Sequence, residues 1–226
     1  VVLAAIDALD AVGLGPLSVD FTLPDLVTTL AAGPLPLSAE QADAVRRELD
    51  TKDAGGLKAA GGEAFLPLIH AAGPFPDALD TLRQLDAGGA LASRIEGLEK
   101  IAAAIGDRAR ITLDPTERHG FEYQSWFGFT LYAANARGAL GRGGTYLIRG
   151  TDEPATGFSI YLGQALPLLE AGEARAMLYL PLGHDRSAAA NLRADGWRTL
   201  AALSADEDPH ALGCTHVLEG AEPQQL

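Results

Sequence analysis

The chain has 226 residues, of which 47% are hydrophobic and 21% are charged, and its formal net charge is -13. This length suffices for one large domain or for one domain with a small appendage. The acidic balance argues against nucleic-acid binding, because a phosphate backbone is bound by basic surfaces. A single cysteine, Cys214, excludes an intrachain disulfide and favours a reducing, cytoplasmic location.

The first elements are a helix and a strand. Apolar residues at near-helical spacing predict a helix over residues 1–14, and alternation of Leu17, Val19 and Phe21 predicts a strand. The chain starts without Met and directly in a helical pattern. We therefore expect further sequence upstream, which would carry part of any active site.

A helical block follows over about residues 38–105. Ser38 and Gln41 have the spacing of a capping box, and paired glycines divide the block into short helices. Its last piece carries one apolar stripe, which indicates core packing. No apolar run reaches the roughly 18 residues of a membrane span.

From residue 110 the pattern becomes that of strands. Residues 110–115 predict a short strand, and residues 123–134 and 139–147 predict an antiparallel hairpin with a glycine-containing loop. The stretch "EPATGFSIYLGQALPLLEAG" predicts a turn followed by a helix.

The tail predicts a small β-α-β-α-β unit after a boundary near Gly172. Its second helix is expected around residues 206–212, and Cys214 is expected to be a buried strand residue. The last residues, "AEPQQL", are expected to be a frayed end.

The usual chemical motifs are missing from the sequence. The five histidines lack ligand spacing and Cys214 has no CxxC partner, so we predict no metal and no cofactor. The glycine cluster "GALGRGG" matches no nucleotide-binding motif and precedes a strand instead of a helix. No serine lies in a nucleophile elbow, so we predict no catalytic residue.

Polar groups gather at the hairpin instead. Arg118, His119, Glu122, Tyr123 and Gln124 lie in or just before its first strand. Across the hairpin stands Tyr146, beside glycines 143 and 144, which permit close approach of a ligand. Such a set suits a small zwitterion, because carboxylates pair with Arg, ammonium groups with Glu, and imidazoles with Tyr or Gln. The residues alone leave open a structural hairpin with solvated carboxylates.

Three ordered segments carry a resemblance to histidyl-tRNA synthetases and their non-catalytic relatives. "ERHGFEYQSWFGFTLYA" resembles the R-G-x-x-Y-x-T-G-x-x-F segment, "LGRGGTY" resembles G-G-R-Y, and "EPATGFSIYLGQAL" resembles the third motif of class II synthetases. The resemblance covers most of residues 1–172. It implies an α+β fold, with a class II synthetase-like antiparallel sheet, helices and a helical insertion at about 38–105. Residues 173–226 would form a small C-terminal α/β unit.

The departures from the pattern indicate a branch of the family. Gln164 stands where the synthetases have an ATP-binding Arg, Thr145 replaces the Arg of G-G-R-Y, and Ser125-Trp126 replaces T-G. His119 stands where an Arg is expected, with Arg118 displaced by one position. The chain therefore resembles the regulatory subunits of ATP phosphoribosyltransferase, which are not enzymes themselves.

This resemblance implies partners and a ligand. The partner would be the short-form catalytic subunit in a hetero-oligomer for the first step of histidine biosynthesis, with histidine as effector and no nucleic acid or membrane. Tyr123 and Gln124 would lie on the amino-acid side of the pocket, and Arg118 or His119 near the carboxylate. The whole implied pocket is Arg118, His119, Glu122, Tyr123, Gln124, Gly143, Gly144, Tyr146 and Gly157. Two alternatives stay open: a degenerate enzyme that still activates an amino acid, and a structural module with a vestigial pocket.

Overall fold

The computed structural model describes residues 1–118, 124–169 and 176–226. The chain divides into two units, Val1–Leu169 and Glu170–Leu226. Each unit has its own sheet and its own hydrophobic core.

The first unit is built on a six-stranded sheet with the strand order β2-β3-β1-β4-β5-β6. The strands are β1 (Leu17–Thr22), β2 (Gly73–Pro74), β3 (Ala109–Leu113), β4 (Gln124–Ala133), β5 (Gly141–Leu147) and β6 (Pro154–Ile160). β1 and β3 are parallel, and the other neighbouring pairs are antiparallel. The antiparallel β4–β5 hairpin confirms the prediction from the sequence.

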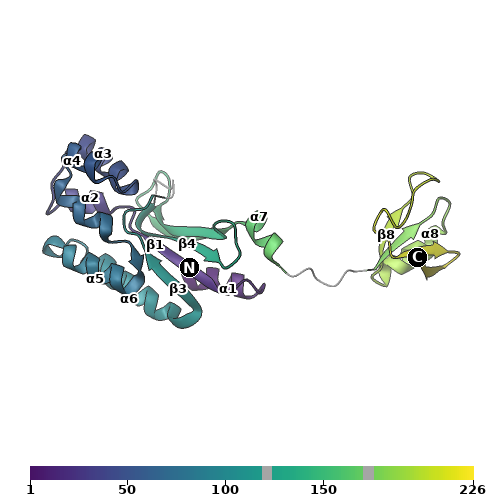
Figure 1. Ribbon diagram of the computed structural model, residues 1–226. Helices are drawn as coiled ribbons and strands as arrows, with labels where there is room; N and C mark the ends of the chain where they lie inside the picture. Colours follow the sequence, from purple (N-terminus) through teal and green to yellow (C-terminus); the bar gives the residue numbers. More distant parts are fainter. Residues whose placement is uncertain (119–123, 170–175) are drawn as a thin grey trace. The chain divides into compact units, whose positions relative to one another are not determined.

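Helices fill the long connection between the parallel strands β1 and β3. The helices of this unit are α1 (Val2–Asp10), α2 (Leu26–Ala31), α3 (Ala39–Asp50), α4 (Ala54–Ala59), α5 (Phe75–Leu85), α6 (Ala92–Ile105) and α7 (Leu162–Ala165), with 3-10 turns at Glu63–His70, Ala87–Gly89, Gly106–Arg108 and Leu166–Leu168. Of these, α2 to α6 lie together beside one end of the sheet (Figure 1).

The predicted start of α3 is confirmed in detail. The Gln41 N–H donates to Ser38 Oγ at 3.2 Å, and the Ser38 N–H donates to Gln41 Oε1 at 3.0 Å. This capping box satisfies two backbone donors that the first turn of a helix leaves unpaired. The start of α3 is therefore predictable from two residues of the sequence.

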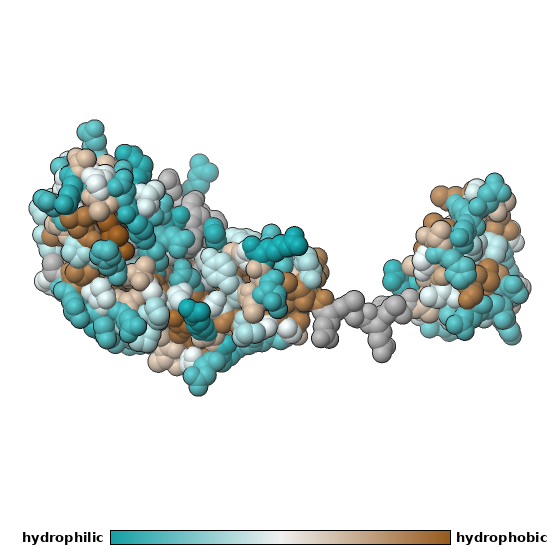
Figure 2. All heavy atoms as spheres, in the orientation of Figure 1, coloured by the Kyte–Doolittle hydropathy of each residue, from teal (hydrophilic) through white to brown (hydrophobic). Residues whose placement is uncertain are grey.

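The core lies between one face of the sheet and the helices. Val19 and Phe21 of β1 are fully buried, and the Phe21 ring centroid lies 6.2 Å from that of Phe127 and 6.5 Å from that of Phe129. Each such apolar side chain contributes about 1.5–3 kcal/mol on burial. The face of the first unit in Figure 2 is mostly hydrophilic, with hydrophobic side chains showing among the helices and near α7.

Glycine lets an aromatic ring cross the sheet surface at β5. A Cβ on Gly143 would lie 2.5 Å from Phe129 Cζ and 2.5 Å from the Gly157 carbonyl oxygen. Phe129 is 1% exposed and pairs with Gly143 in the β4–β5 register. Gly143 therefore belongs to the core side of the sheet, where its missing side chain makes room for Phe129.

The second unit contains a four-stranded sheet with the order β10-β9-β7-β8. Its elements are β7 (Met177–Leu180), α8 (Arg186–Ala194), β8 (Arg198–Ala201), β9 (His216–Glu219) and β10 (Glu222–Gln225). Asp185 caps α8 by accepting the Ser187 N–H at 2.7 Å, and Leu178, Leu180 and Ala189 form the core. Such caps contribute about 1 kcal/mol.

Three local predictions are wrong. Residues 154–160 form strand β6 where a turn was expected, because a first-position proline is tolerated in an edge strand and Gly157 pairs with Gly144. Residues 206–212 form turns, since Asp208 accepts the His210 N–H and Pro209 interrupts the helix. "AEPQQL" contains β10, which pairs with β9 through a tight turn at Gly220, where φ is +63°.

Cys214 is buried, as predicted, but it precedes β9 and is not part of it. Burial raises the pKa of its thiol above the ordinary value. The buried thiol therefore stays protonated at neutral pH and packs as a small apolar side chain.

The Gly143–Phe129 contact gives a first testable expectation. Gly143→Ala should destabilise the protein by about 1–3 kcal/mol, because a Cβ would overlap backbone and a buried ring. Gly163→Ala is the matched control, since open space surrounds the Cβ position there. Urea denaturation of both variants measures the difference, and equal stabilities would show that the sheet can shift freely at this point.

Candidate ligand-binding face

The sheet presents polar side chains on the face opposite its core. Successive residues of a strand point to opposite faces, so Val19 and Phe21 enter the core while Ser18, Asp20 and Thr22 point to the other face, where Thr22 is also buried. Pairing across the sheet aligns one polar row over five strands: Thr112, Asp20, Thr130, Arg142 and Ser159. We call the surface around this row the polar face. Within the row, the Thr112 hydroxyl donates to the Asp20 carboxylate.

A second row carries almost no side chains. Thr22, Gly128, Gly144 and Gly157 are paired across β1, β4, β5 and β6. We call the three glycines the glycine floor. Because glycine lacks a Cβ, no side chain projects from these three positions, although Gly128 and Gly144 are themselves buried.

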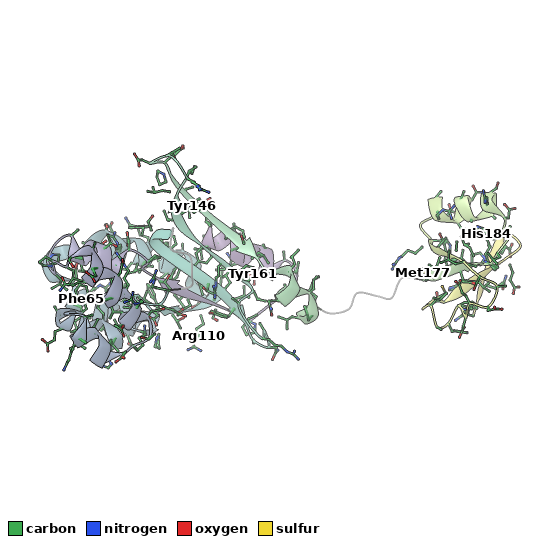
Figure 3. The ribbon with its side chains drawn as sticks, turned by 90° about the horizontal axis from the view of Figure 1, so that it is seen from above. Phe65, Arg110, Tyr146, Tyr161, Met177 and His184 are labelled. Atoms are coloured by element: carbon green, nitrogen blue, oxygen red, sulfur yellow. The ribbon has the colours of Figure 1, made fainter. Side chains whose placement is uncertain are left out.

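Tyr146 borders the glycine floor. A Cβ on Gly157 would lie 3.8 Å from the hydroxyl oxygen and from Cε1 of Tyr146, so its ring extends over that glycine. In Figure 3, Tyr146 lies toward the β5–β6 turn, and Tyr161 lies at the other end of the hairpin. The Tyr146 ring and its hydroxyl group therefore lie beside the Gly157 end of the glycine floor.

A bulge in β4 sets the start of the hairpin. The β4–β5 register shifts between Ser125 and Gly128, and Trp126 has φ +63°. At the bulge the Trp126 side chain packs against α6. A Cβ on Gly97 of α6 would lie only 2.5 Å from the indole, so the ring fits there because residue 97 is glycine. The bulge keeps Gln124 paired with Tyr146. Trp126 occupies the position of the glycine in the Y-x-T-G pattern, and its left-handed backbone explains the usual glycine.

Carboxylates gather where β3 leaves the sheet. Burial raises the pKa of the half-buried Glu117 above its ordinary value, and the negative charges of Asp20 and Asp114 raise it further. The positive charge of Lys52 opposes this rise, and Asp50 adds to it weakly. Glu117 therefore lies within electrostatic reach of the polar face.

Tyr132 interacts both with these carboxylates and with Arg142. Burial raises the pKa of the Tyr132 hydroxyl, and the charges of Glu117 and Asp20 raise it further. Arg142 acts in the opposite sense through its charge and a hydrogen bond. The polar face thus holds anionic, cationic and phenolic groups close together, a combination that suits a zwitterionic ligand.

The structure brings together part of the predicted set. Gly144, Tyr146 and Gly157 share the polar face, and Gln124 is paired with Tyr146. Gly143 faces the core instead. The exposed Arg118 lies in the segment after β3, and its backbone N–H donates to Asp50 Oδ1 at 2.7 Å.

Three predicted residues lie outside the described part of the chain: His119, Glu122 and Tyr123. The sequence-based prediction missed Asp20, Glu117, Tyr132 and Arg142. The alternation of Ser18, Asp20 and Thr22 in the first strand was the available indication of a polar face.

The described segments contain neither a candidate metal site nor a helix that could span a membrane. Within residues 1–118, 124–169 and 176–226, no group of three or more His, Cys, Asp or Glu side chains is placed to hold a metal ion. In the same segments, the helices are too short or too polar to cross a bilayer.

Comparison with known proteins gives consistent results. A family model described as histidyl-tRNA synthetase matches residues 1–165. The chain is 35% identical, over its whole length, to the ATP phosphoribosyltransferase regulatory subunit of Rhodospirillum centenum, and 37% identical, over 94% of its length, to that of Paramagnetospirillum magneticum. It spans 61% and 58% of these relatives.

Solved structures share the fold. A regulatory subunit/histidyl-tRNA synthetase from Bacillus halodurans matches with a TM-score of 0.70 at 20% identity, over 94% of this chain and 61% of that one. A histidyl-tRNA synthetase from Nostoc matches with a TM-score of 0.67 at 15% identity, over 95% of this chain and 60% of that one. These results confirm the class II synthetase-like α+β fold and the resemblance seen in the three segments.

The raised pKa of Glu117 gives a pH-dependent expectation. A carboxyl whose pKa is raised in the folded state favours folding while it is protonated, and this advantage is lost as the pH rises through the folded pKa. Glu117→Gln should therefore stabilise the protein at neutral pH, with a gain that shrinks to nothing below the ordinary pKa of 4.5.

Denaturant unfolding at pH 4 and pH 7 measures this gain. The control is Glu153→Gln, which removes the same charge from an exposed position in the β5–β6 turn. A Glu117→Gln variant no more stable than this control at pH 7 would contradict the expectation.

Proposed function

Because this chain belongs to the histidyl-tRNA synthetase family, we propose that it is the synthetase-like part of a non-catalytic regulatory subunit of ATP phosphoribosyltransferase. The observation that carries the proposal is its 35–37% identity, over nearly all of its length, to relatives of that name. The protein would act with a short-form catalytic subunit in the first step of histidine biosynthesis, within a hetero-oligomer.

The absence of catalysis rests on Gln164. In the family pattern an arginine at this position binds ATP. Gln164 follows β6 in the short helix α7 and is exposed there, with its N–H bonded to the Tyr161 carbonyl at 2.9 Å. A neutral amide cannot neutralise the charge of a triphosphate, so an amino acid would not be activated as its adenylate.

The ligand we propose for the polar face is histidine, as a feedback effector. Its carboxylate fits a cation such as Arg142, and Arg118 or His119 stay candidates for the same role. Its ammonium or imidazole fits the carboxylates of Asp20 and Glu117 and the hydroxyl groups of Tyr132 and Tyr146. The glycine floor lets the ligand approach the backbone closely.

The other proposed members of the pocket complete this set. Glu122 and Tyr123 would act beside Gln124, on the amino-acid side. Retained recognition groups together with a lost ATP-binding arginine favour regulation over two other functions, a residual activating enzyme and a module with a vestigial pocket.

Adenylate formation separates the regulatory function from an enzymatic one. Histidine-dependent ATP–pyrophosphate exchange should be undetectable with the full-length protein, because Gln164 leaves the triphosphate without its cation. An active histidyl-tRNA synthetase assayed in parallel shows that the assay works. Exchange above background would refute the non-catalytic function.

Histidine binding separates the regulatory function from a vestigial pocket. Calorimetric titration of histidine into the complex of the full-length protein and its catalytic partner should release heat. Tyr146→Phe should weaken binding by about 1 kcal/mol, or roughly fivefold, by removing one hydrogen bond.

Tyr161→Phe is the matched control, because it removes the same hydroxyl group at the other end of the hairpin (Figure 3). Equal weakening in both variants, or no heat at all, would mean that the polar face does not bind histidine.

A further inference from the structure

The end of helix α3 has an unusual backbone conformation. The Asp53 N–H donates to the Glu48 carbonyl at 2.9 Å and the Lys52 N–H to the Leu49 carbonyl at 3.1 Å, the pattern of a Schellman cap. The residue in the left-handed position of this cap is Lys52, with φ +57°. Glycine is usual there because a Cβ is strained. A lysine in this position suggests that the side chain is needed.

The Lys52 side chain reaches a segment far away in the sequence. Its Nζ lies 2.8 Å from Asp114 Oδ1 and also donates to the Thr116 hydroxyl. The Lys52 and Asp114 side chains are 31% and 17% exposed, so solvent screens this ion pair less than a surface pair. The Thr116 N–H donates to the same Asp114 oxygen at 3.1 Å, and Thr116 itself is buried.

The same corner of α3 holds the segment at a second point. Asp50 Oδ1 accepts the backbone N–H of Arg118 at 2.7 Å. Asp50 and Lys52 thus contact both ends of residues 114–118. We call these two residues the α3 corner.

Residues 114–118 connect the sheet to the polar face. The Asp114 N–H donates to the Phe21 carbonyl at 2.9 Å, so the segment begins at the end of β3, next to β1. The negative charge of Asp20 raises the pKa of Glu117, and the negative charge of Glu117 in turn raises the pKa of Tyr132. Contacts that hold residues 114–118 in place therefore also determine the positions of Glu117 and Arg118.

We propose that Asp50 and Lys52 are positioning residues, which hold residues 114–118 at the edge of the polar face and so set its affinity for the ligand. The strained cap is retained because glycine would relieve the backbone but release the segment. The α3 corner thereby couples the helical block to the candidate site. This inference rests on the proposed function only for the identity of the ligand.

Lys52→Gly separates positioning from stability. Glycine suits φ +57°, so the loss of the ion pair should be offset and the melting temperature should stay near that of the wild type. Histidine affinity should nevertheless fall by about tenfold, because a binding group held less precisely loses affinity. Lys52→Arg, which keeps a cation in reach of Asp114, should restore most of the loss. Lys58→Met, an exposed change in α4, is the control and should have no effect.

Hydrogen exchange tests the coupling without a ligand. In the full-length protein with its catalytic partner, exchange at the Arg118 amide should speed up by about tenfold in Lys52→Gly and in Asp50→Ala. Asp50→Asn keeps an acceptor oxygen and should preserve the protection.

Hydrogen exchange tests the positioning role, and histidine titration tests the identity of the ligand, so one can be refuted without the other. Unchanged Arg118 exchange in Lys52→Gly would overturn the positioning role, whatever the ligand. If the wild-type complex does not bind histidine, the assignment of histidine as the ligand is refuted. Hydrogen exchange at the Arg118 amide then decides the role of the α3 corner. A loss of affinity strictly proportional to a loss of stability across the variants would also overturn it.

Discussion

The contact between Phe129 and Gly143 fixes which side of the hairpin faces the core and which side forms the polar face. Side chains alternate along a strand, so a shift of the β4–β5 register by one residue would exchange the core face and the polar face. Phe129 is buried over Gly143, its partner in β5, which has no side chain to obstruct the ring. Arg142, Gly144 and Tyr146 point to the opposite face for this reason.

The capping box of α3 and the β4–β5 hairpin were predicted correctly, whereas the strands β6 and β10, which depend on distant pairing, were not. The capping box of Ser38 and the β4–β5 hairpin carry their information within a few residues. β6 and β10 do not, because each is an edge strand that is mostly exposed and is held by its partner strand. Each of these edge strands also contains a proline, which makes it resemble a loop in the sequence.

Some residues of the candidate site were likewise predicted from the sequence, and others were missed because they depend on strand pairing. The resemblance supplied Tyr146, Gly144 and Gly157, which the structure brings together. Gly143 was assigned to the pocket because two adjacent glycines resemble one open surface, although alternation puts only one of them on each face. Asp20 and Arg142 were missed, since only the register of β1, β4 and β5 makes them neighbours in one row.

Two residues with left-handed backbone conformations, Lys52 and Trp126, make side-chain contacts that glycine could not make. Lys52 reaches Asp114, and Trp126 fills the notch at Gly97 of α6. Strained residues persist where surrounding contacts hold them, and they concentrate at functional sites. Glycine would satisfy either backbone, but it could make neither contact. The helices of residues 26–105 therefore do more than cover the sheet: Lys52, just after α3, binds Asp114, and α6 accommodates the Trp126 ring at Gly97.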